Sequence, residues 1–355
     1  MCKFPLVGYW TPQGLKVTSR DEFYQRFSKK IHFLYDEKGD MSGECYSKRS
    51  RHLYSSEYML FVHPVTGVAM RPLQIPCGRC MECRLAYARE WADRLVMEQE
   101  YWADDVCYFL TLTYNDECLP LSESRVPTLS PLHVKYFMMR LRSYFADNFK
   151  YSGIRFYLCG EYGANTHRPH YHIIVFNCPL ELLGDLQYKF KNFQGDHFFV
   201  SEKLDDIWGK GFVVASNVTW DTCCYTARYV TKKIKDLSDS DDSDSFVKEF
   251  SRSSNRPGIG AAYWASHAEK IIKNRGIQLK SGRFAPIPRY FKKMLKESDE
   301  DAYYELQMSS IDYANLRYDQ LIADCPYADE TDYLLASDHD FKKNVLSKLI
   351  RSLDI

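Results

Sequence analysis

The sequence predicts an α+β protein with a central antiparallel sheet of about five strands flanked by helices, an N-terminal extension and a helical C-terminal extension. Two observations favour this class. Runs rich in β-branched and aromatic residues alternate with amphipathic segments, and two of these runs, 154–160 and 170–177, are separated by a turn-rich segment, as in a hairpin. The order strand, helix, hairpin, helical segment, strand and helix is typical of a split β-α-β arrangement.

The predicted elements follow one another from residue 84 onward. Apolar residues recur at intervals of three and four over 84–102, which predicts an amphipathic helix. The β-branched and aromatic segment 106–114 predicts a buried strand. Ser130 and Pro131 predict the N-cap and first position of a helix over about 131–146. Further strands are expected at 154–160, 170–177 and 211–215, a helical segment between the last two, and helices at about 222–235 and 286–295 and after residue 299.

Charge divides the chain, although its 355 residues have a net charge of zero. Residues 236–249 hold six acidic and one basic side chain, and residues 299–355 hold thirteen and five, so the remainder carries a net charge of +13. A basic body with acidic appendages suits a protein that binds phosphates. We expect five regions: an N-terminal region with a cysteine cluster and a helix, a catalytic core, an acidic loop, a basic extension packed on the core, and an acidic helical tail. Their bounds are 1–104, 105–235, 236–249, 250–298 and 299–355.

Composition excludes several classes of protein. An apolar fraction of 45% excludes global disorder. No apolar run of about 18 residues occurs, and the first residues lack the apolar run of a signal peptide, so we expect no membrane span and no export. Twelve cysteines in so long a chain indicate reduced thiols in a cytosol, with room for one metal cluster, and not a disulfide scaffold.

Two histidines on the strand predicted at 170–177 form a candidate metal site. His170 and His172 are two residues apart, so both imidazoles point to one face of the strand. Glu161 precedes His170 by nine residues across a tight turn, and an antiparallel partner strand would bring its carboxylate alongside. Two nitrogen donors and one oxygen donor leave coordination positions open, which is typical of a catalytic site. The residues alone equally allow a packed polar pair, and they allow Mn²⁺ or Zn²⁺ as well as Mg²⁺.

A tyrosine pair lies on the helix predicted after the last strand. Tyr225 and Tyr229 share a helix face, as do Tyr229 and Lys233, and Arg228 and Lys232 lie beside them. A phenol with its ordinary pKa of about 10 is a poor nucleophile, so its attack on a phosphate needs nearby positive charge or a metal-activated electrophile. This helix supplies the cations. The alternative is a pair of packing tyrosines on a helix with a solvated basic face.

Three cysteines before the first predicted helix have the spacing of a zinc knuckle. Two residues separate Cys77 from Cys80, and two separate Cys80 from Cys83. A structural zinc site takes four ligands. Candidates for the fourth are Cys45, His52 and His63. Small packing cysteines at the start of a helix are the alternative.

Several motifs together resemble those of one enzyme superfamily. Residues 166–176 (THRPHYHIIVF) resemble the histidine-hydrophobic-histidine motif of the HUH endonucleases, which initiate rolling-circle replication. Residues 109–113 resemble their first motif, and residues 225–233 resemble their third, in the version with two tyrosines. Within this superfamily the chain is most similar to the replication initiator proteins of microviruses, of the gokushovirus type. That closer resemblance covers about residues 76–295 and rests on segments 76–84, 89–91, 159–163 and 257–260.

The resemblance implies a HUH fold and a DNA nickase. Glu161, His170 and His172 would hold Mg²⁺ or Mn²⁺ at the scissile phosphate of single-stranded origin DNA. Tyr225 or Tyr229 would attack, which forms a 5′-phosphotyrosine link and leaves a 3′-hydroxyl for a host polymerase. The second tyrosine would later attack the regenerated origin, so that the displaced strand is religated into a circle.

The same resemblance assigns supporting residues and partners. Lys232 and Lys233 would lower the pKa of the phenol or stabilise the charge that develops on the phosphorane. Contacts to DNA are expected from Thr111, Thr113, Lys135, Arg140, Arg168 and Arg228. No phosphate-cradling Gly-x-x-x-x-Gly-Lys-Ser/Thr loop occurs, so unwinding would need a host helicase in the bacterial cytoplasm.

Two other functions compete with this interpretation. A histidine-triad nucleotide hydrolase would have a histidine at position 168, where this chain has Arg168. A noncatalytic zinc-dependent DNA-binding or scaffolding protein would use the cysteine cluster as its functional feature and the tyrosines as core. Such a binder would never become covalently attached to DNA. His167 lies on the predicted turn and is expected to be exposed there, not to bind the metal.

Overall fold

The computed structural model describes residues 6–19, 22–23, 26, 33–35, 41–43, 61–70, 72–103, 106–163, 165–192, 195–232 and 247–323. These residues belong to two compact units, each described by itself below. The larger unit is Leu85–Phe291, and the smaller one combines residues up to Arg84 with residues from Lys292 onward.

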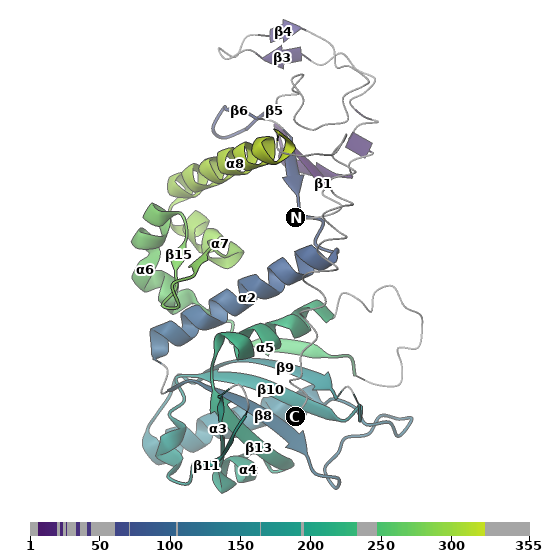
Figure 1. The fold of residues 1–355 in the computed structure, drawn as a ribbon, viewed down its shortest axis with the longest axis vertical. Helices are drawn as coiled ribbons and strands as arrows, with labels where there is room; N and C mark the ends of the chain where they lie inside the picture. Colours follow the sequence, from purple (N-terminus) through teal and green to yellow (C-terminus); the bar gives the residue numbers. More distant parts are fainter. Residues whose placement is uncertain are drawn as a thin grey trace. The chain divides into compact units, whose positions relative to one another are not determined.

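The larger unit contains a seven-stranded sheet in which all neighbouring strands are antiparallel (Figure 1). Its spatial order is β11-β12-β13-β8-β10-β9-β14. In chain order the strands are β8 (Tyr108–Tyr114), β9 (Arg155–Tyr162), β10 (Pro169–Phe176), β11 (Gln187–Lys191), β12 (His197–Val200), β13 (Gly211–Asn217) and β14 (Phe250–Ser253). The predicted α+β class and the antiparallel sheet are confirmed, whereas five strands was too few.

The strands missing from the prediction lie at the sheet's two edges. The segment between β10 and β13 was predicted to be helical, but it contains a 3₁₀ turn, η2 (Leu180–Leu183), then β11 and β12, and only then a short helix, α4 (Glu202–Trp208). Every side chain of β11 is exposed, so this strand has no buried face for an apolar alternation to reveal. β14 has only four residues and exists as a strand through its pairing with β9.

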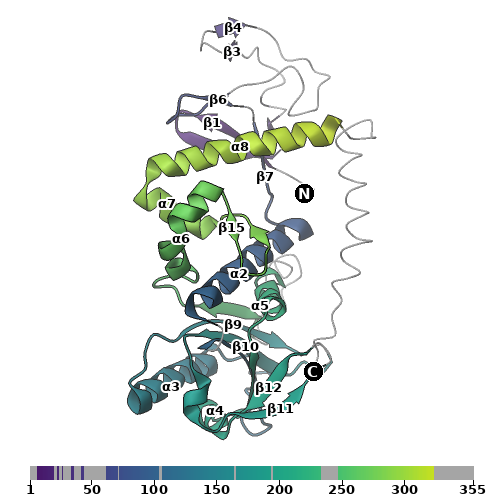
Figure 2. The same cartoon turned by 60° about the vertical axis from the view of Figure 1, so that its left-hand side comes forward.

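Helices cover both faces of this sheet (Figures 1 and 2). α3 (Pro131–Phe149) and α4 pack on one face, where they bury Leu110, Leu112 and Ile173 among others. The part of α2 (Met81–Trp102) from Leu85 onward, together with α5 (Trp220–Lys232), packs on the other face, which includes Phe109 and Ile174. Strand side chains alternate between faces, so the even-numbered residues of β10 all face α2 and α5.

The predicted helices form with small shifts at their ends. α3 begins at Pro131, and the side chain of its N-cap, Ser130, accepts a hydrogen bond from the backbone N–H of His133, as predicted. The buried hydroxyl of Tyr171 in β10 accepts a hydrogen bond from the N–H of Ser130 (2.7 Å) and donates one to its carbonyl (3.0 Å), which fixes the start of α3 to the sheet. α2 begins at Met81, three residues before the predicted start, and α5 begins at Trp220, two residues early.

The segment 257–260, one of the motifs behind the resemblance, is anchored to α2 and β9. The fully buried carboxylate of Glu98 accepts hydrogen bonds from Nε of Arg155 (2.5 Å) and from the backbone N–H of Gly260 (2.6 Å). The guanidinium of Arg94 donates two hydrogen bonds to the carbonyl of Ile259 (3.2 and 2.9 Å). This motif therefore holds the start of α6 (Ala261–Asn274), a helix that the sequence did not predict.

The remaining elements are short strands and two helices. The larger unit also contains the hairpin β15 (Ile277–Gln278) and β16 (Phe284–Ala285) and the start of α7 (Arg289–Ser298). The smaller unit contains a three-stranded sheet of order β2 (Gly14–Thr18), β1 (Leu6–Thr11), β7 (Leu73–Ile75), the pairs β3 (Phe33–Tyr35) with β4 (Met41–Gly43) and β5 (Phe61–Val62) with β6 (Ala69–Met70), and helix α8 (Glu300–Ala323). Among the described helices, none combines the length and the apolarity needed to cross a membrane.

Candidate active site

Three potential metal ligands meet on the sheet face that α5 covers. In the pairing of β9 with β10, His170 lies directly opposite Glu161, and His172 lies opposite Cys159. Glu161 is therefore a strand residue and not part of the predicted turn. One donor atom from each of Glu161, His170 and His172 lies within 4.8 Å of the other two. His167 is exposed on the turn, with a φ of 50°, and is not in this group.

The three side chains are held together by hydrogen bonds to one oxygen. Oε1 of Glu161 lies 2.7 Å from Nε2 of His170 and 2.6 Å from Nε2 of His172. Burial by itself would raise the pKa of Glu161, but the hydrogen bonds from the two imidazoles outweigh it and hold this pKa well below its ordinary value. Burial likewise lowers the pKa of His170, but its hydrogen bond to Glu161 outweighs that effect and raises the pKa above its ordinary value.

The orientation of the rings fits a bound cation. Nδ1 of His170 lies 3.1 Å from the carbonyl oxygen of Arg168, which can only accept, so Nδ1 carries a hydrogen and the neutral ring directs its Nε2 lone pair at Glu161. Nδ1 of His172 lies 3.1 Å from the hydroxyl of Thr111, and its ring stacks on Phe109 with 5.2 Å between centroids. Outer partners of this kind orient histidines that bind metals. Imidazole lone pairs and a carboxylate around one point are all acceptors, so a proton or a cation must lie among them. The donor set therefore fits a divalent metal.

Tyr225 places its hydroxyl among these donors. It lies on α5, where the buried residues Cys223 and Ala227 pack the helix against the sheet. The hydroxyl donates a hydrogen bond to Oε1 of Glu161 at 2.8 Å and lies 3.5 Å from Nε2 of His172. The Tyr225 and His172 rings meet edge to face, with 5.1 Å between their centroids. The structure thus brings one of the two predicted nucleophiles into the predicted metal group.

The other predicted catalytic residues are placed only by the backbone, or not at all. Tyr229 lies one turn after Tyr225, and Lys232 is the last residue of α5, but the structure describes neither side chain. Lys233 lies outside the described residues. Arg228 is partly buried on the same helix. The roles assigned to these four residues stay predictions.

Two predicted DNA-contacting residues beside the site have protein partners. Arg168 donates a hydrogen bond from Nη2 to the carbonyl of Tyr114 (2.9 Å) and pairs through Nη1 with Asp116 (2.7 Å), which ties the β9–β10 turn to the end of β8. The hydroxyl of Thr113 donates to the carbonyl of Phe212 at 3.4 Å. The guanidinium of Arg168 is still partly exposed, so contact with DNA stays a prediction for it.

Lys135 and Arg140 are not brought to the metal group. Both lie on α3, which covers the opposite face of the sheet. Lys135 is exposed there. Arg140 donates hydrogen bonds to the carbonyls of Ile207 (2.6 Å) and Trp208 (2.7 Å), and so caps the C-terminal end of α4. Any contact of these two residues with DNA would use a different surface from that of Glu161, His170 and His172.

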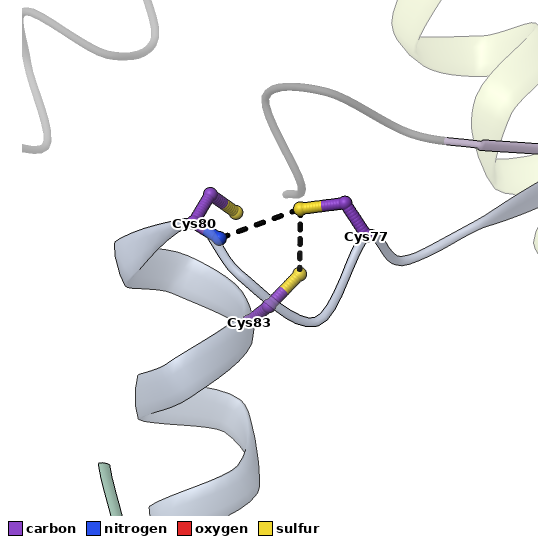
Figure 3. A group of neighbouring side chains, drawn as sticks. All are labelled: Cys77, Cys80 and Cys83. Atoms are coloured by element: carbon purple, nitrogen blue, oxygen red, sulfur yellow. Dashed lines mark hydrogen bonds between the residues drawn. The ribbon is translucent and has the colours of Figure 1, made fainter. Parts of the chain in front are cut away.

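The three predicted zinc ligands also lie together (Figure 3). The sulfur atoms of Cys77, Cys80 and Cys83 all lie within 4.8 Å of one another. His63, one predicted fourth ligand, is not part of this group, and its Nδ1 accepts hydrogen bonds from two backbone N–H groups of the following turn (3.3 and 3.1 Å). The other two candidates, Cys45 and His52, lie outside the described residues.

Comparison with known proteins identifies the family. Residues 107–234 match the family model of the replication-associated protein ORF2. The replication-associated protein ORF2 of Spiroplasma virus 4 is 31% identical over 294 residues, which cover 79% of this chain and 85% of that protein. The chain belongs to this family of replication-associated proteins of small single-stranded DNA phages.

Two further relatives agree with this assignment. The replication-associated protein VP4 of Bdellovibrio phage phiMH2K is 30% identical over 255 residues, covering 69% of this chain and 77% of that protein. The replication-associated protein ORF4 of Chlamydia phage 1 is 29% identical over 256 residues, covering 72% of this chain and 60% of that protein. The resemblance to microvirus initiators of the gokushovirus type is thereby confirmed. No solved structure matches the chain.

Proposed function

We propose that this family member is a rolling-circle replication initiator of the HUH type. It is a metal-dependent, sequence-specific endonuclease that nicks single-stranded viral origin DNA through a 5′-phosphotyrosine intermediate and later religates the displaced strand. The observation that carries the proposal is the convergence of two imidazole nitrogens and the hydroxyl of Tyr225 on Oε1 of Glu161. Membership of a phage replication-associated family supports a role in copying phage DNA.

Glu161, His170 and His172 are the residues that would hold the metal, Mg²⁺ or Mn²⁺. When bound, the ion supplies Lewis-acid polarisation of the scissile phosphate. Imidazole ligands suit Mn²⁺ better than Mg²⁺, which prefers oxygen donors. Three protein ligands leave positions for water and a phosphate oxygen, as nicking requires.

The tyrosine then carries the reaction. As the phenolic oxygen of Tyr225 attacks, a bond forms from this oxygen to phosphorus and the bond from phosphorus to the 3′ oxygen breaks. The 3′ oxygen takes up a proton and leaves as a free hydroxyl, which a host polymerase extends. Lys232 and Lys233 stabilise the negative charge of the phenolate or of the phosphorane. The energy of the broken ester is kept in the phosphotyrosine, so joining needs no ATP.

Joining repeats the chemistry in reverse, with Tyr229 cutting the regenerated origin and the freed 3′-hydroxyl attacking the first phosphotyrosine. In this proposal residues 105–235 form the catalytic core, and a helicase of the bacterial host unwinds the duplex. The histidine-triad alternative loses ground because a carboxylate, Glu161, and not a third histidine completes the donor group beside His170.

A covalent adduct tests the proposal. The purified protein is incubated with single-stranded phage genome and Mn²⁺ and run on a denaturing gel, alongside Tyr225→Phe, Tyr229→Phe and the double variant. We expect an adduct that the single variants still form, that the double variant does not form, and that a chelator abolishes. Tyr188→Phe is the matched control because Tyr188 is an exposed tyrosine on β11.

The contrary result is equally clear. If the folded wild-type protein binds this DNA but never forms an adduct, it is not a nickase, and the noncatalytic DNA-binding function takes its place.

A further inference from the structure

Three cysteines that the nicking reaction does not use are gathered where β7 leads into α2 (Figure 3). Cys77 lies two residues after β7, Cys80 directly precedes α2, and Cys83 lies in its first turn. The sulfur atoms of Cys77 and Cys83 are 4.0 Å apart, and all three sulfurs lie within 4.8 Å of one another. Cys83 is buried and the other two are partly buried.

The backbone between the cysteines is shaped to bring these sulfurs together. Gly78 has a φ of 74°, in the left-handed region that favours glycine, so the chain reverses tightly between Cys77 and Cys80. The reversal lets the backbone N–H of Cys80 donate a hydrogen bond to Sγ of Cys77 at 3.4 Å. A hydrogen bond from an N–H group and the positive end of a helix dipole both favour a negatively charged sulfur.

We propose that Cys77, Cys80 and Cys83 bind a single Zn²⁺ ion as thiolates. Sulfur ligands about 2.3 Å from one tetrahedral ion lie about 3.8 Å from one another, which the 4.0 Å separation of Cys77 and Cys83 matches. The cysteine ligands of an iron–sulfur cluster bind different iron atoms and lie farther apart, so the spacing favours one ion over a cluster.

The donor type selects the metal. Thiolates bind Zn²⁺ and other soft ions, whereas Mg²⁺ and Mn²⁺ prefer oxygen and imidazole ligands. The cysteine group therefore takes a different metal from the group of Glu161, His170 and His172. Within the ranges that the structure describes, no fourth histidine, cysteine or carboxylate joins the cysteines, so the fourth position is open to water or another donor.

Binding has a defined chemical balance and a structural consequence. Each thiol that becomes a ligand releases one proton, so loading the site releases up to three protons per Zn²⁺. The ion then cross-links the turn at Gly78 to the first turn of α2. A structural zinc site contributes directly to the free energy of folding.

Cobalt substitution tests the site in the full-length protein. The protein is purified in reductant, its metal content is measured, and its Zn²⁺ is exchanged for Co²⁺. We expect about one equivalent of Zn²⁺ that a thiol-blocking mercurial releases, and a near-ultraviolet band from sulfur-to-cobalt charge transfer. Only thiolate ligands give this band, so metal held by His170 and His172 does not contribute to it.

Variants assign the band to the three cysteines. Cys77→Ser, Cys80→Ser and Cys83→Ser should each release the equivalent of Zn²⁺, whereas Cys118→Ser, a partly buried cysteine outside the cluster, should keep both metal and band. Cys80→His keeps a ligand atom, so it should retain the metal while the band falls to about two thirds, since two thiolates of three remain.

Two results would overturn the proposal. One is a reduced, folded wild-type protein with no bound Zn²⁺ and no charge-transfer band after Co²⁺ is added. The other is iron with acid-labile sulfide at these cysteines. If the serine variants do not fold, the histidine variant still decides. Neither result bears on the covalent adduct, so the failure of one proposal does not entail failure of the other.

Discussion

Replacing Thr111 with valine should weaken metal binding without removing a ligand. The hydroxyl of Thr111 lies 3.1 Å from Nδ1 of His172, whose ring is almost fully buried and stacks on Phe109. Valine has nearly the same shape but leaves this nitrogen facing a methyl group. Loss of such an outer partner lowers metal affinity by about 10- to 100-fold, or about 1.4–2.7 kcal/mol. The cost of an unmet hydrogen bond in a buried site, about 1–3 kcal/mol, gives the same range.

Thr113→Val is the matched control on the same strand and face. Thr113 lies opposite His170 in the β8–β10 pairing, but its hydroxyl donates to the carbonyl of Phe212. Its replacement should change metal affinity by less than about twofold. Calorimetric titration with Mn²⁺ in the absence of DNA measures both variants and separates metal binding from the DNA contacts predicted for both threonines. Equal losses in the two variants, or no loss in Thr111→Val, would refute the reasoning.

Two further predictions concern protonation and stability. Metal binding needs a neutral imidazole, and Glu161 raises the pKa of His170 above 6.5 against the opposing effect of burial. Mn²⁺ affinity should therefore fall about tenfold per pH unit below that raised pKa and level off above it, and titrations that level off at a pH below the ordinary value of 6.5 would contradict this. Glu98→Ala should destabilise the larger unit by about 3–5 kcal/mol, because it leaves the guanidinium of Arg155 without its buried carboxylate. Urea unfolding followed by tryptophan fluorescence measures this loss, the exposed residue Glu123 gives a control variant, Glu123→Ala, that should shift by less than about 0.5 kcal/mol, and equal shifts for the two variants would sink the assignment.

The sequence predicted the parts of the site that depend on local periodicity. Strand alternation put His170 and His172 on one face, and the short turn before them required an antiparallel partner strand that carries Glu161. Helical spacing put Tyr225 on the side of α5 that also bears Tyr229. These inferences need only the repeat of one element or of two elements joined by a tight turn, and for that reason they could be made without a structure.

The parts that were missed depend on contacts between distant segments. β14 is recognisable only beside β9, because its four residues gain strand hydrogen bonds from that pairing. The second partner of His172 was missed for a similar reason. Thr111 lies opposite His172 only because β8 pairs with β10 in a particular register, and 61 residues separate the two in sequence. Register between distant strands is set by how the whole sheet packs, and a single sequence does not reveal it.

The structure also distinguishes two tyrosines that the sequence left equivalent. The oxygen of Tyr225 lies 2.8 Å from Oε1 of Glu161, which places the phenol beside any ion that this carboxylate binds. Tyr229 is one turn, about 5.4 Å, farther along the helix axis, so the two phenols approach the ligand group from different positions. A nucleophile gains most when it already lies near the attacked atom, and we therefore expect Tyr225 to make the first cut. In the adduct assay, Tyr229→Phe should then form its first adduct faster than Tyr225→Phe, since it retains the phenol that is already in place.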